Sequence, residues 1–247
     1  MRKNARWIGG LLLAVAVTAP LHAQAGDGYL FGPPTGTFTL RGGLSHANAN
    51  SDLFTDLTQQ FTLAKRDFSG FTLGGDVAWS VAPNVDFTID LGFTSTTSPS
   101  HYRNFVDLDN NEIEQSTTLV RVPVTANAKL YLAPTGRSIG RLAWIPSAVV
   151  PWVGAGAGFM YYRLDQTGDF IDQSTNVVSP DELHSSGSTP MAQAMAGADV
   201  NLTPRLALTG DARNLWTKGP KLSSDFRGYQ PLDLSGVALT LGLTVRF

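Results

Sequence analysis

Hydrophobic and polar residues alternate along much of this chain, and the last eleven residues show the pattern without a break. One face carries Val237, Leu239, Leu241, Leu243, Val245 and Phe247, and the other carries Ala238, Thr240, Gly242, Thr244 and Arg246. Successive side chains of a β-strand point to opposite faces, so this segment is a strand with one apolar face. An apolar face on an uncapped strand of a soluble sheet favours aggregation, whereas a closed barrel in lipid has no free edge. The pattern therefore predicts a membrane-spanning β-barrel.

Seven further segments show the same alternation and are separated by turn signals. They cover 36–47, 69–81, 85–96, 116–131, 149–163, 193–202 and 205–216. Short turns at 82–84 and 203–204 contrast with long connections at 48–68, 97–115, 164–190 and 217–232. Barrels of the outer membrane have short periplasmic turns and longer outer loops. We therefore expect an all-β fold, an eight-stranded antiparallel up-and-down transmembrane β-barrel with short periplasmic turns and long outer loops.

The connection at 132–148 departs from this alternation of short turns and long loops, because it falls where a periplasmic turn is expected and is long for one. It predicts either a short helix or an additional hairpin within a ten-stranded barrel. The overlapping segment 142–162 lacks Asp, Glu, Lys and Arg, so hydropathy alone favours a transmembrane helix there. Two prolines and three glycines at every second position oppose a helix, since an interior proline costs about 3 kcal/mol and a glycine about 1 kcal/mol. We interpret the glycines as one face of a strand.

An export signal is predicted for residues 1–25. Three basic residues in the first six positions precede an apolar stretch too short to span a bilayer, and cleavage after Ala23 or Ala25 fits the small residues there. An uncleaved N-terminal anchor is the alternative. Residues 26–247 form the predicted barrel domain, with 15 Lys and Arg against 20 Asp and Glu and a formal charge of −5. That sign argues against nucleic acid as a partner, and the absence of cysteine excludes disulfides and thiolate metal sites.

Three stretches resemble a known group of proteins. They are Leu-Thr-Val-Arg-Phe at 243–247, Pro-Trp-Val-Gly-Ala-Gly-Ala-Gly at 151–158, and Leu-Thr-Gly-Asp-Ala-Arg at 208–213. These stretches are similar to the OmpA/OmpW-like outer-membrane β-barrel superfamily of small, porin-like Gram-negative proteins, with the barrel domain only. The resemblance implies a location in the cell outer membrane. It also implies that Leu243, Val245 and Phe247 form the terminal signal that the barrel-assembly machinery reads.

Ten charged residues fall on the strand faces opposite the apolar ones and are predicted to face the lumen. They are Arg41, Arg121, Lys129, Arg213 and Arg246 together with Asp76, Asp86, Asp90, Asp199 and Asp211. Five charges of each sign balance, and buried charges are tolerated when they are paired. Eight strands enclose an interior that side chains can fill. We therefore predict a salt-bridged, closed lumen, with a narrow polar conduit as the alternative.

Aromatic residues near the predicted strand ends favour a girdle at the lipid–water boundaries, where a ring with a polar edge is well accommodated. They are Trp79, Trp152, Tyr161, Tyr162 and Trp216.

The first outer loop contains Leu53, Leu57 and Phe61 at a four-residue spacing, which predicts a short amphipathic helix within 51–65. Phe61 and Leu63 also alternate, so a longer hairpin is the alternative. In either case, apolar side chains folded over the barrel mouth would make a small hydrophobic pocket.

His184-Ser185-Ser186 has the His-x-Ser spacing of an outer-membrane lipid A deacylase. In that enzyme the motif lies on a strand near a glutamate, whereas the Ser-, Gly- and Pro-rich surroundings here predict an outer loop. A nucleophile, its base and its orienting group need rigid placement, so we expect no catalytic residues.

Residues 107–114 are acidic and begin like a calcium loop, with carboxylates and an amide at alternate positions. An EF-hand is excluded because Glu112 and Thr118 replace the glycine and the glutamate that it requires. A solvated acidic loop is the simpler interpretation, so no metal or cofactor site is predicted.

We expect a non-enzymatic outer-membrane β-barrel protein with a structural, envelope-integrity or surface-interaction role. The alternative is an OmpW-like channel for small hydrophobic molecules, and a third hypothesis is a lipid A or phospholipid-modifying enzyme centred on His184 and Ser186. The expected partners are outer-membrane lipid and lipopolysaccharide, the barrel-assembly machinery and, for a channel, a small hydrophobic ligand.

Overall fold

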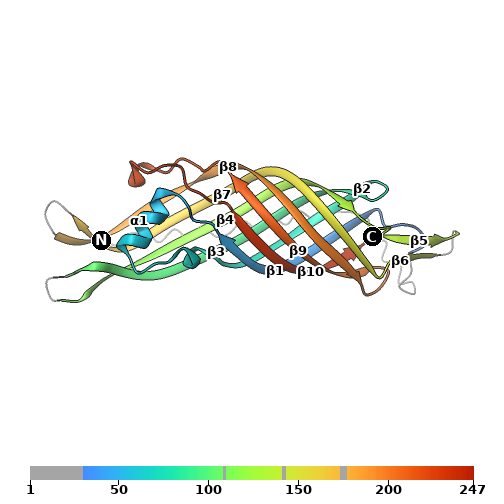
Figure 1. The fold of residues 1–247 in the computed structure, drawn as a ribbon, viewed down its shortest axis with the longest axis horizontal. Helices are drawn as coiled ribbons and strands as arrows, with labels where there is room; N and C mark the ends of the chain where they lie inside the picture. Colours follow the sequence, from blue (N-terminus) through green and yellow to red (C-terminus); the bar gives the residue numbers. More distant parts are fainter. Residues whose placement is uncertain (1–29, 108–109, 141–142, 173–176) are drawn as a thin grey trace, which may run out of the picture.

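Eight strands close into an antiparallel barrel in the computed structural model, which describes residues 30–107, 110–140, 143–172 and 177–247. The barrel strands are β1 (Gly36–Ala47), β2 (Gly70–Ala82), β3 (Val85–Val106), β4 (Glu112–Tyr131), β7 (Val149–Asp172), β8 (Val177–Asn201), β9 (Leu206–Thr217) and β10 (Gly236–Arg246). Their order around the ring is β1-β10-β9-β8-β7-β4-β3-β2 (Figure 1). The predicted up-and-down barrel is confirmed. The predicted export signal at 1–25 lies outside the described residues.

The two ends of the chain close the ring. β1 pairs with β10 from Thr37 opposite Arg246 to Ala47 opposite Gly236. The amide of Phe247 also donates to the carbonyl oxygen of Gly36 at 3.0 Å. Since each barrel strand has a neighbour on both sides through the membrane-spanning part, the backbone polar groups there are satisfied within the chain.

The barrel wall is apolar outside and polar inside. Leu40 and Leu241 are 61 % and 65 % exposed on the outer surface, whereas Thr39, Arg41 and Thr240 are buried in the interior. This arrangement inverts that of a water-soluble barrel, because the outer side chains meet hydrocarbon.

The connection at 132–148 contains a hairpin that does not join the barrel. β5 (Gly136–Ile139) and β6 (Ala143–Pro146) pair only with each other, as a separate two-stranded sheet. Figure 1 shows them at the same end of the barrel as the C-terminus. The additional hairpin is therefore confirmed, whereas the short helix and the ten-stranded barrel are wrong. Within the described ranges, no helix has the length and apolar character needed to cross a membrane.

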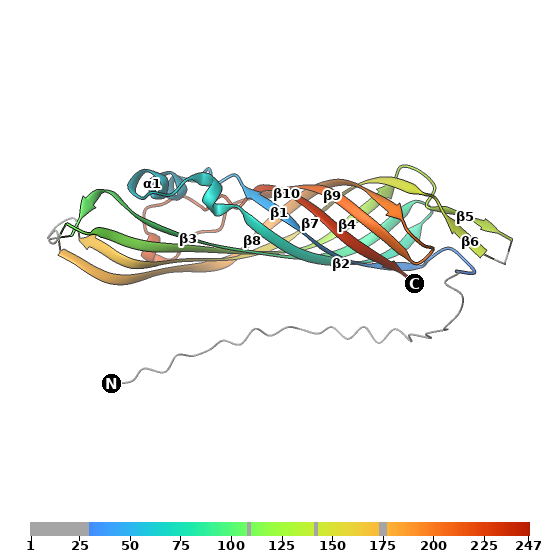
Figure 2. The ribbon, with the colours of Figure 1, turned by 90° about the horizontal axis from the view of Figure 1, so that it is seen from below.

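Four neighbouring strands continue far beyond the apolar belt, which corrects the predicted loops at 97–115 and 164–190. β3, β4, β7 and β8 extend as two long hairpins at the end opposite the C-terminus (Figure 2). Several inward side chains there are polar, such as Ser98, Gln115 and Thr117, and outward ones such as Thr97 are polar too. Where both faces meet water or polar partners, hydrophobic alternation disappears although the strand continues.

The first outer loop forms a helix, as one of the two sequence-based alternatives predicts. α1 (Asp52–Gln60) is followed by a short 3₁₀ helix, η1 (Lys65–Phe68). Leu53, Phe54 and Leu57 lie on the buried face of α1 at helical spacing. Figures 1 and 2 show α1 beside the extended hairpins at the outer end of the barrel.

The contact between β1 and β10 leaves no room for a side chain at Gly43. A Cβ atom there would lie 2.0 Å from the carbonyl oxygen of Leu239, whereas one at Gly42 would lie 3.1 Å from the end of the Phe71 ring, an exposed side chain that can shift outward. We expect Gly43→Ala to destabilise the closed barrel by about 1–3 kcal/mol, since it forces two backbones apart. Gly42→Ala is the matched control and should remain near wild type. Urea unfolding and the gel shift between folded and boiled protein measure the difference, and equal stability of the two variants would contradict the argument.

Candidate functional site

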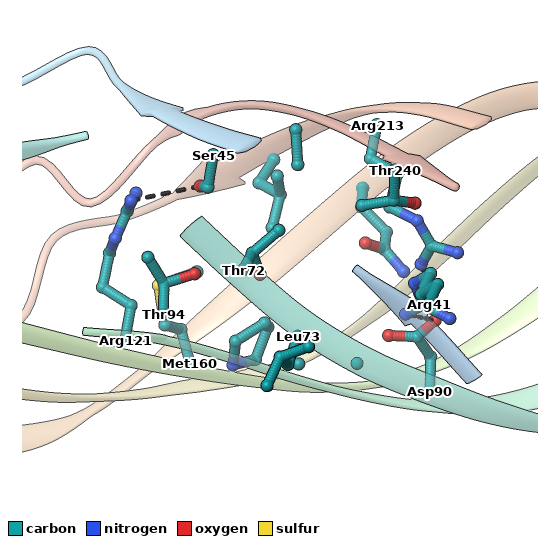
Figure 3. A pocket seen from close by; sticks show the side chains of 16 residues that line it. Arg41, Ser45, Thr72, Leu73, Asp90, Thr94, Arg121, Met160, Arg213 and Thr240 are labelled. Atoms are coloured by element: carbon teal, nitrogen blue, oxygen red, sulfur yellow. Dashed lines mark hydrogen bonds and ion pairs between the residues drawn. The ribbon is translucent and has the colours of Figure 1, made fainter. Parts of the chain in front are cut away.

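A charged cluster crosses the middle of the lumen. Asp90 on β3 accepts hydrogen bonds from Arg41 on β1 and from Arg213 on β9, the latter at 2.5 Å. Arg41 also binds Asp76 at 2.7 Å, and Arg213 binds Asp211 at 2.6 Å. β3 and β9 are four strands apart in either direction around the ring, so the Asp90–Arg213 pair spans the barrel's diameter. Figure 3 shows Arg41, Asp90 and Arg213 converging in the lumen.

A second layer fills the lumen towards the end that carries the C-terminus. Lys129 binds Asp199 at 3.2 Å and lies over the rings of Trp152 and Tyr131, at 4.3 and 4.8 Å from their centroids. The indole of Trp152 donates to Asp199 at 3.1 Å, and the hydroxyl of Tyr131 donates to Asp86 at 2.8 Å. These buried carboxylates are therefore matched by the Lys129 cation and by the hydrogen-bond donors of Tyr131 and Trp152.

A small cavity of about 40 Å³ lies on the other side of the central cluster. It is lined by Arg41, Asp90 and Arg121, among others (Figure 3). Arg121 donates to Ser45 at 3.1 Å, and in the part of the chain that the structure describes no carboxylate lies within ion-pairing distance of it. A space of this size holds ordered water rather than a solute.

An apolar cap closes the outer mouth above this cavity. It consists of buried side chains from α1, the neighbouring loops and the inner faces of the long strands: Ala47, Ala49, Leu53, Phe54, Leu57, Phe61, Leu63, Phe68, Leu119, Met160, Tyr162, Leu164, Met191, Phe226, Leu232 and Leu234. Phe54 packs on Phe68 with ring centroids 4.5 Å apart. The hydrophobic groups of the first loop thus fold over the mouth, where their side chains are buried against one another.

The loop between β9 and β10 holds α1 in place. It contains a short 3₁₀ helix, η2 (Ser224–Phe226), and the amide of Gln230 donates to Asp52 at 2.9 Å. Burial, with a hydrogen bond and the negative charge of Asp56, raises the pKa of Tyr229 to about 12. The cap is therefore fixed by polar bonds at its rim.

The structure places all ten charged residues of the predicted lumen network on the inner face. Eight of them are at most 8 % exposed, and the side chains of Asp76 and Lys129 are 15 % and 13 % exposed. They do not form one network, because Arg121 and Arg246 bond to neutral groups, Ser45 and Asn201. Leu243, Val245 and Phe247 face outward at the end of β10.

Comparison with known proteins gives the family. The model of the outer membrane protein β-barrel domain matches residues 10–247. The chain belongs to this family. The protein is accordingly located in the cell outer membrane. A search of curated proteins found no match.

Several solved outer-membrane barrels have a similar fold at low identity. OprG from Pseudomonas aeruginosa is 14 % identical with a TM-score of 0.47, covering 88 % of this chain and 99 % of its own. Neisserial surface protein A is 15 % identical with a TM-score of 0.45, covering 85 % and 97 %. Escherichia coli outer membrane protein W is 13 % identical with a TM-score of 0.36, covering 87 % and 99 %.

In this outer-membrane barrel, only part of the predicted aromatic girdle faces lipid. Trp79, Tyr161 and Trp216 lie on the outer surface, with 42 %, 47 % and 48 % of their area exposed. Trp152 and Tyr162 do not belong to the girdle, because both are buried inside the barrel. Both residues lie at positions of β7 that alternate with its outward-facing residues. This two-residue alternation was the signal in the sequence that could have assigned them to the interior.

The His184 motif is also placed differently from the prediction. His184, Ser185 and Ser186 lie on β8 and not in a loop, with His184 and Ser186 on the outer surface. The carboxylate beside His184 belongs to Asp165 on β7 rather than to Glu182. The acidic segment that begins at Asp107 lies partly outside the described residues.

Removing the shared carboxylate of the central cluster tests its energetic role. Asp90→Asn leaves two buried guanidinium groups without their common partner, and we expect a loss of about 3–5 kcal/mol. Asp76→Asn is the matched control and should cost less, because Asp76 is more exposed and pairs with Arg41 alone. Urea titration in lipid vesicles followed by tryptophan fluorescence measures both. A loss at Asp90 no larger than that at Asp76 would contradict the assigned role.

Proposed function

We propose that the lumen of this outer-membrane barrel is closed and carries out no chemistry, and that the protein acts in envelope integrity or surface interaction through its long outer hairpins. The observation that carries the proposal is the Asp90–Arg213 ion pair across the full diameter of the barrel. The apolar cap gives independent support, because it obstructs the mouth above that pair.

The lumen side chains favour a stabilising role over chemistry. The carboxylates of Asp90, Asp199 and Asp211 are all engaged by cations or hydrogen-bond donors from the wall. A satisfied polar interior rigidifies a structure, whereas an active centre needs groups that are free to meet a substrate. A rigid barrel is a suitable support for the hairpins that it projects from the membrane.

The proposed partners follow from the outer surface. Outer-membrane lipid and lipopolysaccharide would contact the exposed apolar belt, which includes Phe71 and Phe159. The barrel-assembly machinery would read the outward row of Leu243, Val245 and Phe247 at the end of β10.

Passage of small hydrophobic molecules is the second candidate, and the apolar cap is the observation that favours it. A hydrophobic solute entering between Phe54 and Phe68 would next meet the cavity beside Arg41 and Arg121. Leaving an apolar environment for buried charge is unfavourable, so the layered interior supports the closed barrel over a route along the axis.

Permeability of reconstituted vesicles tests the closed barrel. We expect no conductance in planar bilayers, no swelling of vesicles with small sugars, and uptake of an apolar fluorescent solute no faster than in protein-free vesicles. Phe54→Ala with Leu57→Ala should loosen the cap without opening the lumen, because the charged layers remain. Saturable, protein-dependent uptake of the apolar solute would support the channel instead, and steady conductance would refute the closed lumen.

A further inference from the structure

Three side chains on the outer wall of β7 and β8 form a hydrogen-bonded chain. His184 Nδ1 lies 2.5 Å from Asp165 Oδ1, and His184 Nε2 lies 3.3 Å from Ser186 Oγ. The register places His184 directly opposite Asp165, and Ser186 follows His184 by two residues on the same face. A carboxylate, an imidazole and a hydroxyl therefore stand in the order that activates a serine nucleophile.

The backbone around His184 is held on both sides. β7 pairs with β8 on one side, and the loop after β9 bonds the other edge. The amide of His184 donates to Asp225 at 3.1 Å, and the hydroxyl of Ser223 donates to the carbonyl oxygen of His184 at 2.5 Å. Ser185 is buried beneath, 2.9 Å from the hydroxyl of Tyr162. The motif thus has the rigid placement that a flexible loop would lack.

The hydrogen bonds assign a role to each group. An ionised Asp165 only accepts, so His184 Nδ1 carries the ring proton and Nε2 is left to accept the proton of Ser186. Arg163 donates to the other oxygen of Asp165 at 2.6 Å and fixes the orientation of that carboxylate. Since the antiparallel ladder alternates, the N–H of Ser186 points to the same edge as that of His184, beside the Ser186 hydroxyl. An N–H at this position can donate to the oxyanion that forms when Ser186 attacks an ester.

The three groups lie at the outer boundary of the lipid-facing belt. Tyr161 and Phe159, which precede Arg163 on the same face of β7, are exposed on the outer surface. Amphipathic rings occupy the level at which acyl chains meet headgroups, and the esters of membrane lipids lie at that level. Ser186 is exposed and the His184 side chain is 49 % exposed, so a lipid in the outer leaflet can reach both.

The outward side chains of the wall below Phe159 are small. Ala155 lies opposite Ala194, and Ala157 lies opposite Ala192, all on the outward faces of β7 and β8. We propose that Asp165, His184 and Ser186 form a catalytic triad that hydrolyses ester-linked acyl chains of amphiphiles in the outer leaflet. This activity goes beyond the proposed structural function and departs from the expectation, drawn from the sequence, that the chain has no catalytic residue.

The reaction needs water as its only co-reactant. Ser186 Oγ attacks the ester carbonyl carbon while its proton passes to His184 Nε2. The bond between that carbon and the alcohol oxygen breaks, and the alcohol leaves with the proton from Nε2. Water, deprotonated by His184, then attacks the acyl-serine, and the serine oxygen recovers the proton, releasing a fatty acid. Asp165 stays ionised throughout and stabilises the imidazolium.

Full-length protein refolded in detergent and in vesicles provides the test. It is incubated with a fluorophosphonate probe, which labels activated serines, and separately with lipopolysaccharide and with a diacyl glycerophospholipid to measure fatty-acid release. We expect labelling at Ser186 and ester hydrolysis, with losses of about 100-fold or more in Ser186→Ala and His184→Ala. Asp165→Asn should lower the rate strongly while the barrel remains folded on the gel. Ser188→Ala is the matched control, because Ser188 is exposed on the same face of β8 two residues further on.

The outcomes separate the substrate sources and the two proposals. Fatty-acid release from only one of the two lipids supports the triad and identifies that lipid as the substrate. A folded barrel with neither labelling nor release, or with release unchanged in Ser186→Ala, overturns the triad. Vesicle permeability reports on the closed lumen independently, because the triad lies on the outer wall.

Discussion

Pairing of the first strand with the last is the constraint on which this molecule depends. Backbone N–H and C=O groups in hydrocarbon have no water to bond, so the sheet must close on itself. Closure by β1 and β10 separates an outer face that meets lipid from an inner face that does not. The apolar row from Leu239 to Val245 and the buried Thr240 and Thr244 of the same strand follow from that separation.

The narrow interior explains why the lumen is layered. An eight-stranded ring is small enough for Arg213 on one wall to reach Asp90 on the opposite wall. Buried charges at that distance are tolerated only when their partners are fixed, and the rigid wall fixes them. The cap formed by α1 then excludes water from the outer mouth, so the polar layers are enclosed at that end. The side chains of the lumen therefore contribute to the stability of the barrel. Other molecules contact the protein on its outer surface.

The sequence predicts the membrane-spanning part of the fold, because lipid requires the outer face of each strand to be apolar while the inner face is polar. Alternation located the strands of the belt, and it assigned the buried charges such as Asp90 and Arg213 to the inner face. It did not reveal the extensions of β3, β4, β7 and β8, because serines and threonines on both faces carry no contrast. The charge pairing, including the neutral partner of Arg121, depends on strand register, which composition does not encode. The contact between Asp165 and His184 was missed for the same reason, since it required β7 and β8 to continue as strands with His184 opposite Asp165.

Unequal strand lengths make the part of the protein outside the membrane one-sided. β3, β4, β7 and β8 are consecutive in the ring, so they rise together as a sheet whose two lateral margins are not paired by a barrel strand. Unpaired margins attract strands of other molecules. The chain occupies both margins with its own loops: Thr62 bonds the backbone of His101 on β3, and Ser223 and Asp225 bond that of His184 on β8. These loops protect the strand edges and prevent edge-to-edge pairing between neighbouring copies on a crowded cell surface. The two broad faces of the sheet therefore remain as the surfaces available for recognition.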